Sequence, residues 1–240
     1  MWFRLLILNH LSSEMSIHLS DRHLNLILLP TEKCNFRCTY CYESFDVGRM
    51  EDSVVSGVKA LISNRIPELD SILISWFGGE PMLGMDVIEK ISAHIQEEIA
   101  SLNPDCFYKS NITTNGFLLS KNQASKLLKL GVKEYQISLD GDEAEHNKTR
   151  IRANGKGTYS DIVRNLLGMS EFDDHFDVII RVHFHPANLS SIEGLLSSLP
   201  EKIKGDSRFH FYFKAIHHLG GKNDHEFDVV GYKSEDEISD

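Results

Sequence analysis

From residue 23 onward, apolar runs of strand length alternate with longer stretches of helical composition. The strand-like runs lie at 23–29, 71–77, 107–113, 134–139, 177–184 and 208–214. The helical stretches between them lie at about 51–65, 85–101, 120–130, 158–170 and 188–199. A strand that is regularly followed by a helix is typical of βα units, which build a parallel sheet covered by helices. We therefore predict an α/β chain that forms a partial (β/α)6 TIM-like barrel with parallel strands.

Polar side chains recur at every second position of four of these strands. Such positions share one face of a strand, and the opposite faces carry Val, Ile, Leu and Phe. Because helices must cover an apolar face, we expect the polar face to line a cavity inside the barrel. The alternative is an open antiparallel sheet with one face in water. The polar positions are Lys109, Asn111, Thr113, Gln136, Ser138, Asp140, Arg181, His183, His185, His210, Tyr212 and Lys214.

Composition divides the chain into an N-terminal extension (1–22), a core domain (23–220) and an acidic C-terminal tail or start of a further segment (221–240). The apolar start of the chain is too short to span a bilayer, so we predict no membrane contact and a cytoplasmic location. The formal net charge of −10 argues against broad nucleic-acid binding, which requires a basic surface.

Three of the four cysteines, Cys34, Cys38 and Cys41, form a CxxxCxxC segment directly after the first strand. Such clustering indicates a metal site in a reducing compartment and not a disulfide framework. Three thiolates at this spacing suit three corners of a [4Fe–4S] cluster, whose fourth iron would then be open to a small molecule. The alternative is a zinc site completed by Cys106 or a histidine. If Cys106 does not bind a metal, we expect it to be a buried structural thiol.

The predicted ends of later strands carry further short motifs: GGEP at 78–81, TNG at 114–116, SLDG at 138–141, and HNKTR at 146–150 shortly after. Together with CxxxCxxC, they resemble the radical S-adenosylmethionine (SAM) superfamily over about residues 23–222. Within it they resemble the core domain of peptide- and protein-modifying members, including anaerobic sulfatase-maturating enzymes and ribosomal-peptide maturases. Those members usually carry a C-terminal cysteine-rich domain with auxiliary clusters, which has no counterpart here because no cysteine follows Cys106.

The resemblance implies the places of both cofactors. The three cysteines would hold a [4Fe–4S] cluster whose open iron chelates the amino and carboxylate groups of SAM. Glycine lets backbone approach a ligand closely, so the GGEP segment would contact the SAM amino group. An arginine among Arg150, Arg152 and Arg181 would pair with the carboxylate, and its place on the polar face favours Arg181. The remaining implied SAM contacts are Tyr40 near the adenine, Gly78, Gly79 and Glu80 at the amino group, and Asn115 and Ser138 at the ribose or the carboxylate.

The resemblance also implies the reaction. An external one-electron donor, flavodoxin-like or ferredoxin-like, would reduce the cluster, and SAM would be cleaved to methionine and a 5′-deoxyadenosyl radical. That radical would abstract hydrogen from a substrate, a peptide or protein side chain by resemblance to the subgroup. Two alternatives remain open: a radical SAM enzyme acting on a small metabolite or nucleotide, and a truncated non-catalytic cluster-binding or partner protein. The candidate acid–base side chains facing the substrate are Asp140, His183, His185, His210 and Tyr212.

Overall fold

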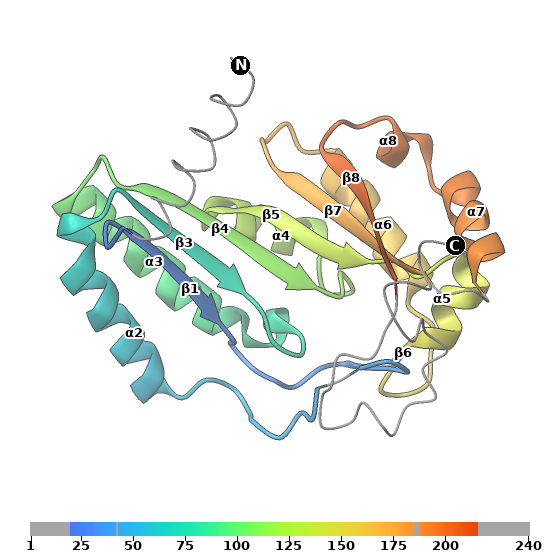
Figure 1. The fold of residues 1–240 in the computed structure, drawn as a ribbon, viewed down its shortest axis with the longest axis horizontal. Helices are drawn as coiled ribbons and strands as arrows, with labels where there is room; N and C mark the ends of the chain where they lie inside the picture. Colours follow the sequence, from blue (N-terminus) through green and yellow to red (C-terminus); the bar gives the residue numbers. More distant parts are fainter. Residues whose placement is uncertain (1–19, 42, 185–187, 216–240) are drawn as a thin grey trace, which may run out of the picture.

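The predicted strands form one parallel sheet in the computed structural model, which describes residues 20–41, 43–184 and 188–215. The strand order, β1-β3-β4-β5-β7-β8, follows the chain, and each neighbouring pair is parallel (Figure 1). The predicted parallel α/β architecture is confirmed and the antiparallel alternative is wrong. The strands are β1 (His23–Leu28), β3 (Ser71–Trp76), β4 (Phe107–Thr114), β5 (Val132–Ser138), β7 (Asp177–Phe184) and β8 (Phe209–Ala215).

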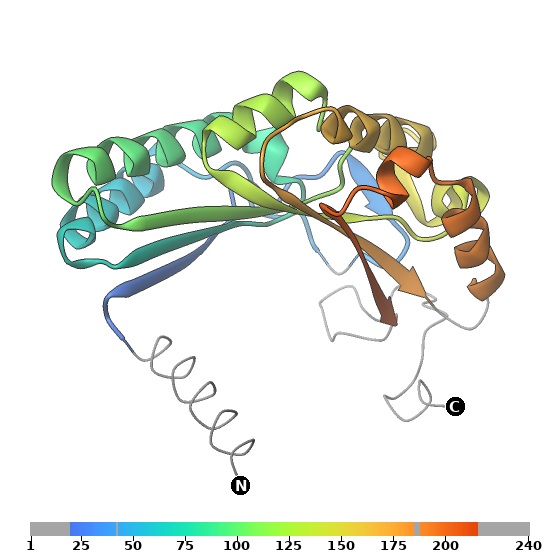
Figure 2. The ribbon, with the colours of Figure 1, turned by 90° about the horizontal axis from the view of Figure 1, so that it is seen from above.

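The predicted helices are also present, each within a few residues of its expected bounds. They are α2 (Asp52–Arg65), α3 (Met85–Leu102), α4 (Lys121–Lys129), α6 (Tyr159–Ser170) and α7 (Leu189–Ser198). Figure 2 shows α2, α3, α4 and α6 along one face of the sheet, while the described residues place no helix on the opposite face. The sequence did not predict the short pieces η1 (Ile66–Glu68), η2 (Pro81–Gly84), α5 (Glu143–Thr149) and α8 (Glu201–Lys204).

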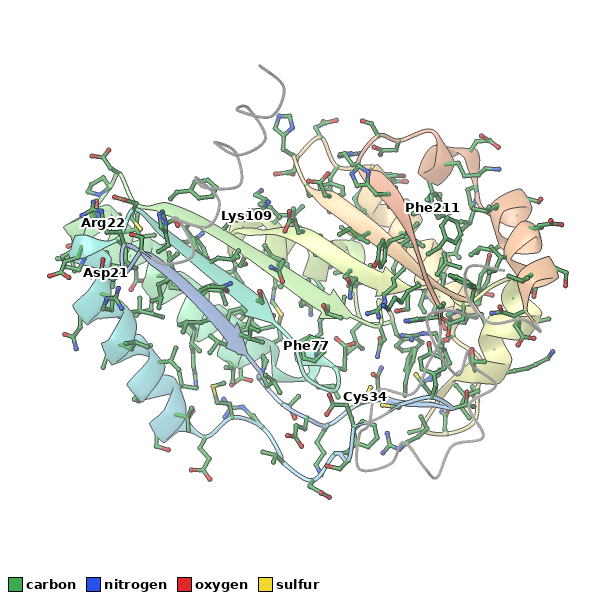
Figure 3. All side chains as sticks on the ribbon, in the orientation of Figure 1. Asp21, Arg22, Cys34, Phe77, Lys109 and Phe211 are labelled. Atoms are coloured by element: carbon green, nitrogen blue, oxygen red, sulfur yellow. The ribbon has the colours of Figure 1, made fainter. Side chains whose placement is uncertain are left out.

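The core lies between the sheet and these helices. In β3, Ile72, Ile74 and Trp76 are fully buried, and they alternate with partly exposed residues. Each isoleucine side chain buried in this way contributes roughly 1.5–3 kcal/mol. The other face of the sheet is polar, as predicted: Lys109 forms an ion pair with Glu134, with 2.6 Å between Nζ and Oε1 (Figure 3).

A two-stranded antiparallel ribbon lies beyond the carboxyl end of the main sheet (Figure 1). It pairs β2 (Phe36–Cys38) with β6 (Arg150–Arg152), and Cys38 stands opposite Arg150. Two further backbone bonds extend the contact: Thr39 N donates to Thr149 O at 2.9 Å, and Ala153 N donates to Asn35 O at 2.9 Å. The ribbon therefore fixes the cysteine segment on the chain that follows α5.

The predicted division at residues 22 and 220 stays a prediction, because 1–19 and 216–240 lie outside the described residues. Within the described residues, none of the helices has the length and apolar character needed to cross a bilayer.

Gly57 provides a test of the helix assignment. It is exposed inside α2, and a Cβ added there would meet nothing within 4 Å. Gly57→Ala should therefore stabilise the fold by about 1 kcal/mol, because alanine loses less backbone entropy in a helix. Gly131→Ala is the contrasting variant: its φ is +86°, and its Cβ would lie 2.5 Å from Tyr108 Cε1. Urea unfolding should show destabilisation at Gly131, and a loss of stability at Gly57 would contradict the assignment.

Candidate active site at the carboxyl edge of the sheet

The GGEP loop packs directly against the chain that enters the cysteine segment. Gly78 has a φ of +116°, and a Cβ there would lie 2.4 Å from Thr31 O. A Cβ on Gly79 would lie 2.1 Å from Glu32 O. The two backbones are also bonded, since Glu80 N donates to Lys33 O at 3.0 Å. These glycines thus make room for the protein's own backbone. Contact of this loop with SAM stays a prediction.

Glu80 is fully buried, and both of its carboxylate oxygens are engaged by the protein. Oε1 accepts from Thr114 Oγ1 at 2.7 Å and from Met82 N at 3.0 Å, and Oε2 accepts from Asn115 N at 2.7 Å. Burial raises the pKa of Glu80, and the bond from the Asn115 amide opposes part of that rise. Glu80 therefore ties the GGEP loop to the TNG loop, and its predicted contact with the SAM ammonium stays a prediction.

The Asn115 side chain faces the cysteine segment. Its Nδ2 donates to Asn35 Oδ1 at 2.8 Å and lies 3.8 Å from Cys34 Sγ, while its Oδ1 accepts from Phe117 N at 3.0 Å. Phe36 N also donates to Cys34 Sγ, at 3.4 Å. The predicted bond of Asn115 to the ribose or carboxylate of SAM stays a prediction. N–H groups directed at a sulfur are the contacts that tune a thiolate ligand.

The buried Asp140 and Arg150 meet the partly buried Tyr40 and His183 in one group, although the four residues are far apart in the sequence. The Tyr40 hydroxyl donates to Asp140 Oδ2 and accepts from Arg150 Nη1, the latter at 2.8 Å. His183 Nδ1 lies 2.9 Å from Asp140 Oδ1, and its ring centroid is 5.2 Å from that of Tyr40. Thr149 Oγ1 donates to Asp140 Oδ2 at 3.2 Å. The sequence predicted four of these residues but assigned them to separate roles.

The electrostatics of this group keep Asp140 ionised. Burial alone would raise the pKa of Asp140, but its interactions with His183 and with the Arg150 guanidinium outweigh burial and hold that pKa well below its usual range. Burial, together with the Asp140 carboxylate, raises the pKa of Tyr40, so the phenol keeps its proton. The group is thus a phenol held between a carboxylate, to which it donates, and a buried guanidinium, from which it accepts.

The three clustered cysteines are free thiols, each partly buried. Burial raises their pKa values, that of Cys38 to about 12 despite the nearby Arg150 guanidinium. Since metal ligands must be deprotonated, loading this segment with iron is coupled to proton release.

The zinc alternative finds no support in the described part of the chain, where no three His, Cys, Asp or Glu side chains converge on one ion. Cys106 is buried as predicted, but it precedes β4 at the amino edge of the sheet. Figure 3 places Cys34 beyond the carboxyl end of β1, at the opposite edge from Arg22. Thiolates of a cubane cluster bind separate iron atoms, so they need not converge, and the three cysteines fit such a cluster.

Ser138, Arg181 and Tyr212 lie side by side across three strands. Strand register pairs Ser138 with Arg181 and Arg181 with Tyr212. Within the described residues, the buried Nε of Arg181 has no hydrogen-bond partner. Tyr212 is 53% exposed. An unpaired guanidinium on the polar face is suited to an anionic ligand such as a carboxylate.

The other predicted residues are placed less favourably. His210 is wrong as a neighbour of this site: it stands opposite Ile179 in the amino half of β7 and pairs with Asp177 Oδ1 at 3.0 Å. Arg152 stacks on Phe117, with 4.6 Å between its Cζ and the ring centroid. His185 lies outside the described residues.

Sequence reasoning missed two residues that support the group, His146 and Thr149. Both belong to the HNKTR segment, which was singled out only for its resemblance. His146 is fully buried.

The family model described as the Radical SAM superfamily matches residues 28–198, more than half of the 240 residues. The chain belongs to the radical SAM superfamily. Members of this family are enzymes that use SAM and an iron–sulfur cluster.

Two curated relatives of this radical SAM chain differ in chemistry. It is 31% identical over 225 residues to a GTP 3′,8-cyclase of Campylobacter jejuni, covering 86% of this chain and 61% of the relative. It is 26% identical over 172 residues to a cysteine-type anaerobic sulfatase-maturating enzyme of Clostridium novyi, covering 68% and 44%. The chain thus spans about half the length of the curated relatives it matches.

Solved structures share the fold. The structure of anSMEcpe with bound AdoMet and the Kp18Cys peptide has a TM-score of 0.62 at 22% identity, and the match covers 80% of this chain and 51% of that one. Streptococcus suis SuiB bound to its precursor peptide SuiA has a TM-score of 0.57 at 17% identity, covering 85% and 42%. At these identities the likeness establishes the shared partial-barrel fold.

Glu80→Gln tests the structural role of the buried carboxylate. The amide would present a donor where three protein donors now converge, so unfolding free energy should fall by about 2 kcal/mol. The matched control is Glu97→Gln on the exposed face of α3, which should change stability by less than about 0.5 kcal/mol. Equal stability of the two variants in urea would contradict the role of Glu80.

Proposed function

We propose that this chain binds a [4Fe–4S] cluster on Cys34, Cys38 and Cys41 and cleaves SAM reductively to abstract hydrogen from a substrate. The observation that carries the proposal is the fixed cysteine segment. Backbone bonds from the GGEP loop and from β6 hold it at the carboxyl edge of the sheet, where partial barrels keep their active sites. The buried group of Tyr40 and Asp140 lies beside it.

The bound cluster, once reduced by an external donor of the flavodoxin or ferredoxin kind, supplies the electron that cleaves SAM to a 5′-deoxyadenosyl radical. The chain's own residues orient the reactants. In this proposal Arg181 and Ser138, which are neighbours across β7 and β5, hold the SAM carboxylate, and Tyr40 contacts the adenine. Asp140 and His183 are the candidate proton-handling pair, since they share a bond of 2.9 Å and face the polar side. Tyr212, level with Arg181, is a candidate contact for the substrate.

The substrate class that we favour is a peptide or protein side chain. Similarity to a sulfatase-maturating enzyme and to a PqqA peptide cyclase of Granulibacter bethesdensis supports it, as do structural neighbours solved with peptides. A small nucleotide is the second candidate, because the similarity to a GTP 3′,8-cyclase covers 86% of this chain. A non-catalytic cluster-binding role is disfavoured by the complete Tyr40–Asp140–Arg150 group.

Anaerobic reconstitution tests the central step. With SAM and dithionite, the chain should yield 5′-deoxyadenosine, measured by mass spectrometry, and the triple variant Cys34→Ala, Cys38→Ala, Cys41→Ala should yield none. The control Cys106→Ala should keep both the iron content and the product, because that thiol lies at the other edge of the sheet. Iron binding that depends on Cys106, or zinc binding without cluster assembly, would overturn the proposal.

A further variant tests the carboxylate contact. Arg181→Gln should raise the apparent KM for SAM by roughly 10-fold, since a charge-assisted bond is lost. Its stability should not fall, because the buried Nε has no protein partner in the described residues. Arg152→Gln, whose parent side chain stacks on Phe117, is the control and should leave the KM near its original value. A larger rise in the KM for SAM with Arg152→Gln than with Arg181→Gln would indicate that Arg152 binds the SAM carboxylate.

A further inference from the structure

His146 lies next to the group of Tyr40 and Asp140 and bonds to the backbone N–H of Asp140. It lies on α5 and is fully buried. Its Nδ1 accepts from the backbone N–H of Asp140 at 3.3 Å, and its Nε2 lies 2.9 Å from Thr158 Oγ1. The Thr158 hydroxyl donates onward to Arg150 O at 2.7 Å. A single imidazole thus connects the backbones of the two residues whose opposite charges meet at Tyr40.

The direction of these bonds fixes the tautomer of His146. A backbone N–H can only donate, so Nδ1 must be unprotonated to accept from Asp140. Thr158 uses its one proton on Arg150 O, so its oxygen must accept, and Nε2 must carry the imidazole proton. A doubly protonated ring would set two donors against each other at Asp140. Burial acts in the same direction and lowers the pKa of His146 to about 3.

The surrounding chain restrains the ring further. Tyr159 packs edge-on against it, with 5.6 Å between centroids. The neighbouring Asn147 Oδ1 accepts from Thr158 N at 2.7 Å and from Tyr159 N at 3.1 Å. The start of α6 is therefore bonded to α5 through two adjacent residues, His146 and Asn147, which restrains the ring.

We propose that His146, as a neutral Nε2–H imidazole, is the positioning residue that sets Asp140 and Arg150 on either side of Tyr40. Because Cys38 pairs with Arg150 in the ribbon, this bridge also sets the distance between the cysteine segment and the end of β5. The effect on turnover rests on the proposed function, whereas the tautomer and the bonding do not.

Nitrogen-15 NMR of the reconstituted, histidine-labelled protein tests the tautomer directly. One ring, assigned by its disappearance in His146→Gln, should show a protonated Nε2 and a bare Nδ1 at both pH 8 and pH 6. An Nδ1–H tautomer, or protonation of this ring between those two pH values, overturns the proposal. This measurement tests the tautomer of His146 even if the protein releases no 5′-deoxyadenosine. Thr158→Val keeps the shape of the side chain but removes the oxygen that accepts from His146 Nε2. This variant should therefore shift the Nε2 resonance of His146, and it identifies that resonance if the His146 variants do not fold.

Turnover variants test the positioning role. His146→Asn keeps an acceptor toward Asp140, and His146→Gln keeps a donor toward Thr158. Each should retain cluster iron but lose roughly 10-fold in the rate of 5′-deoxyadenosine release at saturating SAM, the size of effect known for residues supporting metal ligands. The control His94→Gln alters a histidine bonded to Ser63, at 2.9 Å, away from this edge, and should keep the full rate.

A double-mutant cycle with Tyr40→Phe separates positioning from a general loss of structure. If His146 acts through Asp140 and Arg150 on Tyr40, the double variant His146→Gln, Tyr40→Phe should be no slower than about the worse single variant. Losses that multiply, or single His146 variants with the wild-type rate, contradict the proposal. If the wild-type protein itself releases no product, the proposed function fails and the NMR result alone decides the fate of this inference.

Discussion

The pairing of Phe36–Cys38 with Arg150–Arg152 is the contact on which the site depends. Cys34 and Cys41 lie outside any strand or helix, so nothing local specifies their position. The ribbon holds one side of their segment, and the GGEP loop holds the other, through glycines whose missing Cβ atoms leave room for Thr31 and Glu32. Two contacts made by distant parts of the chain, the ribbon and the GGEP loop, thus fix the position of the irregular loop that carries the cysteines.

Buried charge is balanced within the same small volume. Asp140 and Arg150 are 1% and 7% exposed, and the Tyr40 hydroxyl bonds to both. Burying either charge alone would be costly, and removing one partner leaves the other uncompensated. Tyr40 belongs to the cysteine segment, so this charge pair also fixes the segment from inside. Stability and cofactor geometry are therefore coupled through one phenol.

The sequence predicts the strands and long helices because their apolar periodicity extends over many residues. It does not predict β2 and β6, since three residues carry no detectable period and their partners are distant. The group around Asp140 was predicted residue by residue, yet the bonds of Glu80 and Asn115 to protein atoms depend on tertiary packing that spacing does not reveal. The prediction for His210 was wrong for a related reason. Alternation shows which face of a strand a residue lies on, but not how far along the strand it lies. His210 is level with Ile179, near the amino end of β7.

The ribbon has a consequence for the order of assembly. Cys38 reaches its final position only when β2 pairs with β6, and Arg150 of β6 lies about 110 residues later in the chain. During synthesis the three thiols leave the ribosome long before their frame exists, so a cluster inserted then would lack both the ribbon and the GGEP support. Iron loading therefore belongs after β6 has paired with β2.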